Sequence, residues 1–102
     1  MDFKAGLDEI VLFELPAART AERLLVHLAP HRLAWLQSGD RISVVGALLK
    51  PDADDLARLL WSVQEWLDDM GFAAIRFDVD GRTYVLEARR VLEAARATLA
   101  VR

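Results

Sequence analysis

Hydrophobic and polar positions alternate along the chain with two different periods, one typical of strands and one typical of helices. Apolar side chains occupy both faces of the segments Asp8–Leu15 and Arg41–Leu49, which predicts two strands that are covered from both sides. From Ala17 to Ala29 they recur every three or four positions, which predicts a helix. Pro16 suits the start of that helix, and Pro30 ends it because proline disfavours helical geometry in the preceding residue.

The middle of the chain predicts a hairpin and then a long helix. Leu33–Gln37 and Arg41–Leu49 are expected to be strands on either side of the turn sequence Ser38-Gly39-Asp40. The helix is expected over Ala53–Met70, with Asp52 as its N-cap, acidic residues in its first turn and Gly71 as its C-terminal glycine. Its predicted core stripe consists of Leu56, Leu60, Val63, Leu67 and Met70, with Leu59 and Trp66 at the edge.

A second hairpin is predicted near the C-terminus, where Ile75–Val79 and Arg82–Leu86 flank Asp80-Gly81. This dipeptide is preferred in two-residue type I′ turns, whose geometry determines which residues face each other. The turn sets Phe77 opposite Tyr84 and Ile75 opposite Leu86, so that one face of the hairpin is apolar. A closing amphipathic helix is expected over 88–101, with its apolar stripe at Val91, Leu92, Ala95 and Leu99.

The predicted order is therefore β-α-β-β-α-β-β-α, a single α+β domain over residues 1–102, with residues 1–7 as a flexible lead-in. Its first six elements match the split β-α-β, or ferredoxin-like, arrangement, and the last strand and helix are additions to it. The first and third strands are central in that arrangement. Because a two-layer fold covers only one sheet face, either the C-terminal helix or a second copy of the chain must cover the other.

Composition narrows the class of protein. The chain has 102 residues, 54% of them hydrophobic and 28% charged, a net charge of −3 and no cysteine. The absence of cysteine excludes a disulfide framework, thiolate metal sites and thiol catalysis. The longest apolar runs, Ile10–Phe13 and Val44–Leu49, are far shorter than the ~20 residues of a membrane span. The first residues lack a signal-peptide pattern, so we expect a cytoplasmic protein without membrane association.

The titratable residues suggest no catalytic or metal site. His27 and His31 have a ligand-like spacing, but Pro30 separates them and breaks the helix that they would need to share. The carboxylate groups have structural explanations at helix ends and turns; they are Asp52/Asp54/Asp55, Asp68/Asp69 and Asp78/Asp80. No serine stands in a nucleophile elbow, and the five glycines form no phosphate-binding loop. We therefore expect no enzyme activity, no cofactor and no metal.

Nucleic-acid binding is also disfavoured. Ferredoxin-like sheets that bind RNA present aromatic and basic residues on a central strand, but Arg41–Leu49 contains no aromatic residue. The isoelectric point near 5.3 argues against a broad phosphate-binding face. No nucleic-acid partner is expected.

Tryptophan positions point instead to protein contacts. Trp61 falls about 140° around the helix from Leu56, among charged residues, where a tryptophan is unusual. Tryptophan is enriched at binding hot spots, although Trp61 could equally lie flat over neighbouring side-chain stems. Trp35 lies in a strand beside a turn and could belong to the core or to an edge contact. The candidate protein-contact residues are Trp61, Trp35 and Phe13.

One part of the chain resembles a known family. The stretch Leu56–Val91 carries Trp66-Leu67 on a helix, then Ile75-Arg76-Phe77, and then the hairpin sequence Asp80-Gly81-Arg82 through Leu86-Glu87-Ala88. It resembles the effector-associated constant component domains of actinobacterial conflict systems, which have a W-L helix followed by a D-G-R…L-[DE]-A hairpin. The likeness covers roughly the last third of the chain. It implies a non-catalytic adaptor that recruits other proteins, and it carries over no catalytic or ligand residue. The arginine-rich, lysine-poor composition is typical of a GC-rich bacterial genome.

Three functions remain open at this point. The first is a small non-catalytic interaction or regulatory module that self-associates through the sheet face or the Trp61 side of its long helix, with a protein partner or homodimer as its expected state. The alternative is a small-molecule sensor of the ferredoxin-like type, with a ligand held in a pocket. The third is a small enzyme without a recognisable motif.

Overall fold

The computed structural model describes residues 10–100, with side chains described up to residue 96. The predicted lead-in 1–7, the first two residues of the strand Asp8–Leu15 and the end of the closing helix at Val101 lie outside the described residues. The elements are β1 (Ile10–Leu15), α2 (Ala18–Leu28), β2 (Ala34–Ser38), β3 (Ser43–Leu48), α3 (Asp55–Met70), β4 (Ala74–Val79), β5 (Arg82–Glu87) and α4 (Arg89–Ala100).

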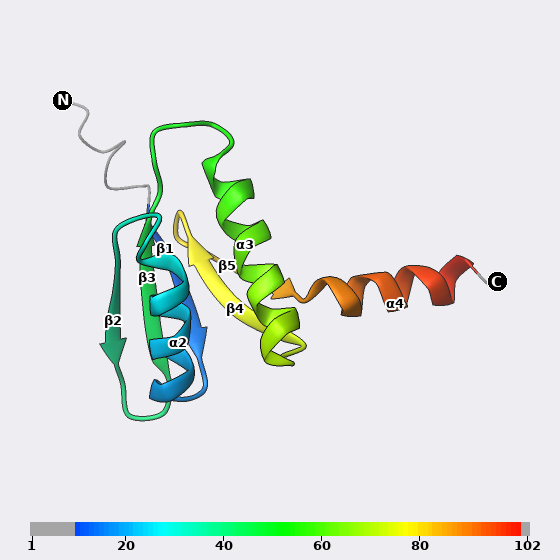
Figure 1. Ribbon diagram of the computed structural model, residues 1–102, viewed down its shortest axis with the longest axis horizontal. Helices are drawn as coiled ribbons and strands as arrows, with labels where there is room; N and C mark the ends of the chain where they lie inside the picture. Colours follow the sequence, from blue (N-terminus) through cyan, green and yellow to red (C-terminus); the bar gives the residue numbers. More distant parts are fainter. Residues whose placement is uncertain (1–9, 101–102) are drawn as a thin grey trace.

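The protein is an α+β structure with one five-stranded antiparallel sheet and three helices (Figure 1). The strand order is β2-β3-β1-β4-β5, and every neighbouring pair is antiparallel. β1 and β3 both lie inside the sheet, with a strand on each side, as their apolar sequences predict. None of the helices in residues 10–100 combines the length and apolar character that crossing a membrane requires.

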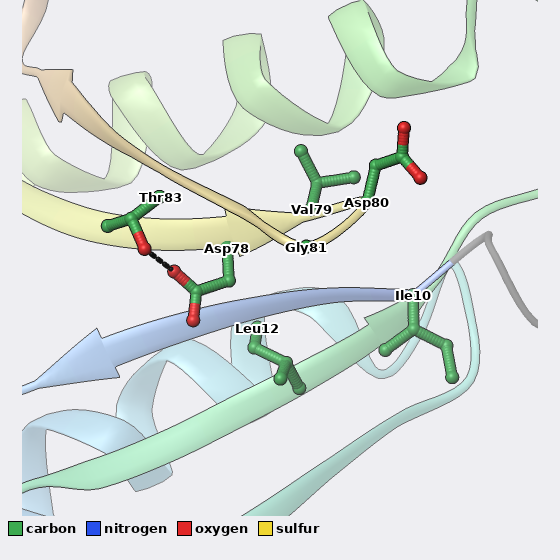
Figure 2. A pocket seen from close by; sticks show the side chains of 7 residues that line it. All are labelled: Ile10, Leu12, Asp78, Val79, Asp80, Gly81 and Thr83. Carbon is green, nitrogen blue, oxygen red and sulfur yellow. Dashed lines mark hydrogen bonds between the residues drawn. The ribbon is translucent and has the colours of Figure 1, made fainter.

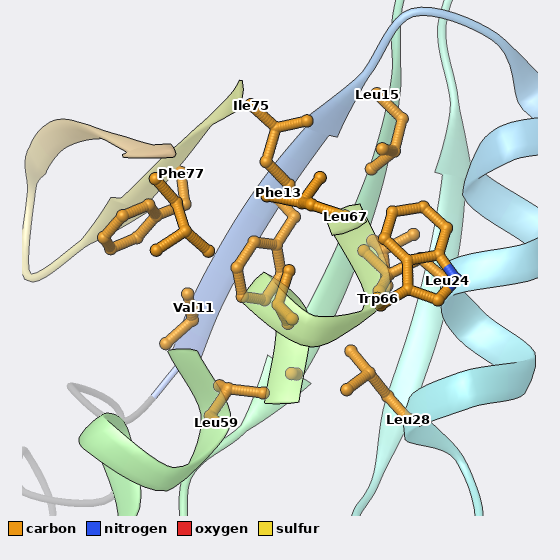
Figure 3. Packing of buried hydrophobic residues seen from close by; sticks show 14 of the residues in the cluster. Val11, Phe13, Leu15, Leu24, Leu28, Leu59, Trp66, Leu67, Ile75 and Phe77 are labelled. Atoms are coloured by element: carbon orange, nitrogen blue, oxygen red, sulfur yellow. The ribbon is translucent and has the colours of Figure 1, made fainter. Parts of the chain in front are cut away.

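The core lies between the sheet and the pair of helices α2 and α3. Along β1, the buried residues Val11, Phe13 and Leu15 alternate with half-buried ones, so one face of the strand is sealed and the other is not. Phe13 packs against Phe77 of β4 with ring centroids 5.9 Å apart. Figure 3 shows these side chains meeting Leu24 and Leu28 of α2 and Leu59, Trp66 and Leu67 of α3.

The hairpin β4–β5 confirms the predicted turn and register. Phe77 faces Tyr84 and Ile75 faces Leu86 across the strands. Asp80 and Gly81 have φ angles of 54° and 74°, the left-handed geometry that a type I′ turn requires at both central positions. The Phe77 and Tyr84 rings stack with centroids 5.4 Å apart, which adds a cross-strand contact to the turn. The local chemistry of this segment is sufficient to define its structure.

The start and the orientation of α3 differ from the prediction. The helix ends at Gly71 in a left-handed conformation, as expected, but it begins at Asp55 rather than Ala53. Asp52 does not cap it: its Oδ1 accepts a hydrogen bond from the Asp54 N–H in the preceding turn. The buried positions are Leu59, Val63, Trp66 and Leu67, whereas Leu56, Leu60 and Met70 are only half-buried.

This rotation of α3 has a physical cause. Trp61 and Trp66 have the two largest side chains of the helix and lie about 140° apart around it, so only one of them can face the core. With Trp66 turned inward, its large apolar area is removed from water while Trp61 stays 53% exposed. Trp66 stacks on Phe72, with ring centroids 6.0 Å apart, and faces the α2 side of the core. Periodicity alone shows which positions share a side of the helix, but it does not compare the apolar area of one indole with that of several smaller side chains.

The last helix, α4, stands away from the sheet. Only its first turn is packed, through buried Ala88 and half-buried Val91, while Leu92 and Ala95 of its predicted apolar stripe are exposed. Figure 1 shows α4 projecting from the body on the side of α3. It therefore does not cover the second face of the sheet in its own chain.

Candidate functional site

The most conspicuous functional feature is the sheet face that no described helix covers, called here the open face. Strand register and side-chain alternation assign its members. They are Trp35 and Gln37 of β2, Val44, Gly46 and Leu48 of β3, Ile10, Leu12 and Glu14 of β1, Ala74, Arg76 and Asp78 of β4, and Thr83, Val85 and Glu87 of β5. On β2, β3 and the first part of β1, the open face is mostly apolar. Its charged residues begin with Glu14 at the end of β1 and continue across β4 to the end of β5.

Trp35 lies flat over β3 on the open face. Its partner across the strands is Gly46, and a Cβ atom at that position would lie only 2.3 Å from the indole ring. Only glycine leaves room for this close approach of an aromatic ring to the backbone. Trp35 is consequently half-buried against β3 and forms part of the open face on the edge strand β2.

Phe13 has a different position from the two tryptophans. It points toward the helices and is completely buried among core residues. Its side chain contributes to the core and offers no surface to a partner.

The charges of the open face are incompletely paired. Glu14 and Arg76 are directly opposite each other on β1 and β4, yet neither makes an ion pair or a side-chain hydrogen bond within the described residues. Asp78 accepts a hydrogen bond from the Thr83 hydroxyl at 2.6 Å. With Glu87, the open face has three carboxylates and one arginine, a net charge of −2.

A hollow of about 510 Å³ lies on the open face beside the β4–β5 turn (Figure 2). Ile10 and Leu12 form an apolar wall, and Asp78 and Thr83 supply polar groups from the hairpin, whereas the Asp80 side chain points to the α3 side of the turn. An apolar wall with a carboxylate nearby matches the chemistry of a long cationic side chain, whose stem is apolar and whose end is charged.

Trp61 is half exposed, at 53%, and lies under the start of α4. Its Nε1–H donates a hydrogen bond to Glu65 at 3.1 Å, and the Arg89 guanidinium lies 4.4 Å from the ring centroid. This geometry is a cation–π contact between α3 and α4. The prediction that Trp61 points outward among charges is confirmed, and the tryptophan helps to hold the last helix.

Other contacts fix the first turn of α4. The guanidinium of Arg90 lies 3.3 Å from the Asp68 carboxylate and donates to the Phe72 carbonyl at 3.0 Å. The Arg90 N–H also donates to Asp68, and the Ala88 N–H donates to the Ala73 carbonyl at 2.8 Å. Together with Arg89 on Trp61, these contacts set the direction in which α4 leaves the body.

A buried ion pair connects three distant parts of the chain. Asp55, 2% exposed, accepts hydrogen bonds from both terminal nitrogens of Arg32, at 2.6 and 3.1 Å, and from the Lys50 N–H at 2.8 Å. Arg32 also donates to the Leu48 carbonyl. The Arg32 guanidinium lowers the pKa of Asp55 from 3.8 to about 2. Periodicity cannot reveal a pair 23 positions apart, and the sequence analysis missed it.

His27 and Ser62 form the contact that most resembles a catalytic pair. His27 Nε2 lies 2.9 Å from Ser62 Oγ and 3.3 Å from the Ser62 carbonyl oxygen. The contact to the carbonyl oxygen needs a proton on Nε2, whereas the shorter contact to the hydroxyl is made with either ring nitrogen protonated. The contact joins α2 to α3.

The histidine and carboxylate groups do not assemble into a metal centre in the described part of the chain. The helix α2 ends at Leu28, so His27 and His31 do not share one helix. No group of three His, Cys, Asp or Glu residues within 10–100 is arranged to hold a metal ion. On the surface, Asp52 accepts a hydrogen bond from the Asp54 N–H and pairs with Arg58 at 2.9 Å. Both contacts lower the pKa of Asp52.

Comparison of the chain with protein-family models, with curated proteins and with solved structures finds no match. The functional argument therefore depends on the geometry of the chain itself.

Proposed function

We propose that this protein is a non-catalytic interaction module that self-associates through the open face of its sheet. The observation that carries the proposal is the apolar surface of β2, β3 and β1, which no helix among residues 10–100 covers. A sheet face of this character is ordinarily buried against another layer. Because no described element of the same chain supplies this layer, a second copy does so.

Charge on the open face favours a second copy as the partner. Glu14 and Arg76 are adjacent, opposite in sign and unpaired among the described residues. A second copy carries the same two signs of charge, so it can offer a partner to each of these unpaired groups in a closed dimer.

We also infer that the first six elements form a split β-α-β core of the ferredoxin-like type. The spatial order β2-β3-β1-β4 and the placement of β1 and β3 inside the sheet support this assignment. Such a core with one uncovered face suits assembly into a three-layer or four-layer dimer.

A non-catalytic role agrees with the use of the titratable groups. Asp55, whose pKa is strongly lowered, is occupied by Arg32 inside the fold, and His27 is occupied by Ser62. The resemblance of the last third to effector-associated constant component domains also implies an adaptor. Of its motif residues, Trp66 belongs to the core and Asp80-Gly81 form the hairpin turn, so both have structural roles here.

The test is the mass of the full chain in solution, by light scattering or sedimentation over a range of concentrations. We expect a species near twice 11.5 kDa. Val85→Asp, on the open face and 61% exposed, should give a folded monomer. Val26→Asp is the matched control, because Val26 is an exposed valine (71%) on α2, on the other side of the molecule.

Three results would contradict parts of this proposal. A single mass of 11.5 kDa at all concentrations would remove self-association. Equal disruption by the two valine substitutions would remove the open face as the interface. A folded monomer produced by Trp61→Ala, with Val85→Asp still dimeric, would move the interface to the Trp61 side of α3.

A further inference from the structure

The helix α4 is held in a direction that keeps it from its own open face. Its first turn is attached to α3, on the helix side of the sheet, through Arg90 to Asp68 and Arg89 to Trp61. To reach the open face of its own sheet, the helix would have to pass around β5 and break these contacts. Figure 1 shows it extending outward instead.

The exposed part of α4 has the character of a docking helix. Leu92, Ala95 and Arg96 lie at i, i+3 and i+4, so they share one side of the helix. Leu92 is 41% exposed, and Ala95 and Arg96 are also exposed. An amphipathic helix of 12 residues, about 18 Å long, matches the width of a five-stranded sheet with strands about 4.8 Å apart.

Charge matches α4 to the open face. Arg89 and Arg90 are engaged with α3, so the positive charge that the exposed part of α4 offers comes from Arg96, whereas the open face has a net charge of −2. Arg96 has no ion-pair partner among the described residues. The hollow between Leu12 and Asp78 presents an apolar wall and the Asp78 carboxylate, the groups that an arginine stem and guanidinium bind.

We propose that α4 of each copy lies across the open face of the other copy, with Arg96 directed into the hollow beside Asp78. This inference rests on the proposed self-association and specifies how it is built. The two contacts are reciprocal, so the dimer is closed by a twofold axis and each sheet gains its missing layer from the partner's helix.

Cysteine cross-linking tests the arrangement directly, because the natural chain contains no cysteine. Leu12→Cys lies on β1, the central strand, which any helix crossing the open face must approach. Ala95→Cys lies on the exposed side of α4. When the two full-length variants are mixed and oxidised, we expect a disulfide between Ala95→Cys and Leu12→Cys chains. Val26→Cys mixed with Ala95→Cys is the control that should give only background.

The same experiment separates this inference from the proposed function. A dimeric chain in which Leu12→Cys links mainly to itself would indicate sheet-on-sheet packing and overturn the α4 arrangement while leaving self-association intact. A dimer in which the mixed cross-link does not exceed the Val26→Cys control would also overturn it. A monomeric full chain would instead overturn the proposed function.

Charge reversal provides a second measurement at the hollow. Arg96→Asp should weaken dimerisation about tenfold, because it places a carboxylate beside Asp78. Asp78→Arg combined with Arg96→Asp should restore most of the affinity. Glu93→Arg is the control for a general effect of charge on α4. Failure of the double variant to recover, with both variants folded, would contradict the placement of Arg96.

Discussion

At the scale of single residues, Asp55 connects three separate parts of the chain. Its carboxylate joins the loop after α2, the end of β3 and the start of α3 through Arg32 and the Lys50 N–H. Both members of the pair are buried, with exposed fractions of 8% for Arg32 and 2% for Asp55. Removing one partner of a buried pair leaves the other charge without compensation, which typically costs about 3 kcal/mol or more.

The pair predicts a specific acid sensitivity. The pKa of Asp55 is about 2 in the folded protein and 3.8 ordinarily, so the unfolded chain binds a proton at higher pH than the folded chain does. The resulting stabilisation is complete above the unfolded pKa and is lost as pH falls from about 5 to 2, by about 2 kcal/mol in total. Urea unfolding at a series of pH values should show this loss.

Asp55→Asn should lower stability at pH 7 by about 3 kcal/mol and remove this part of the acid dependence. Asp52→Asn is the matched control, because Asp52 pairs with Arg58 on the surface. An Asp55→Asn protein with the same acid slope as the natural chain would contradict the assignment.

Among the elements, the hairpin β4–β5 shows how a local signal can define a structure. Asp80-Gly81 imposes a register that also places the apolar residues of both strands on one face. The helix α4 is the opposite case. Its periodicity predicted an amphipathic helix correctly, but its direction follows from Arg90, Asp68 and Trp61, which lie on separate elements.

At the β4–β5 turn, the effect of a substitution on stability can be predicted from backbone conformation alone. Gly81 has a φ of 74°, and a Cβ atom there would meet nothing within 4 Å. Gly81→Ala should therefore destabilise the protein by about 1 kcal/mol through backbone strain alone. Gly71→Ala, at a φ of 81° with equally open surroundings, should cost a similar amount. Asp80→Asn should be nearly neutral, because asparagine tolerates this conformation. Chemical denaturation measures all three, and an unaffected Gly81→Ala protein would contradict the turn geometry.

At the scale of the whole molecule, the two faces of the sheet differ in what covers them. The helices α2 and α3 seal one face of the sheet, while the apolar part of the open face and the exposed side of α4 both lack partners among the described residues. The exposed side of α4 carries Arg96, the open face has a net charge of −2, and the length of α4 matches the width of the sheet. A dimer that joins them completes the layers that a sheet of this composition requires.

Assembly of this kind predicts a melting temperature that rises with protein concentration, because only the folded chain associates. Thermal unfolding followed by circular dichroism over a hundredfold range of concentration should show the rise. Val85→Asp should abolish the concentration dependence, and Val26→Asp should retain it. A natural chain whose melting temperature is independent of concentration would argue against a dimer coupled to folding.

The sequence by itself determined the features that depend on neighbouring residues. Proline and glycine positions, Asp80-Gly81 and the two apolar periods were enough for the order of the elements, the register of the last hairpin and the end of α3 at Gly71. Apolar residues on both faces of two strands also placed those strands inside the sheet. These signals are local or repeat regularly, so they can be read without knowing what lies across the core.

Only the tertiary structure decided the rotation of α3, the pairing of Arg32 with Asp55, the burial of Phe13 and the direction of α4. Each depends on groups that are distant in sequence and that compete for the same space. Trp66 outweighs smaller side chains for the core, and contacts to α3 hold the last helix away from the sheet. The open face results from this competition, because a periodic pattern specifies which side of an element is apolar but not which surface will cover it.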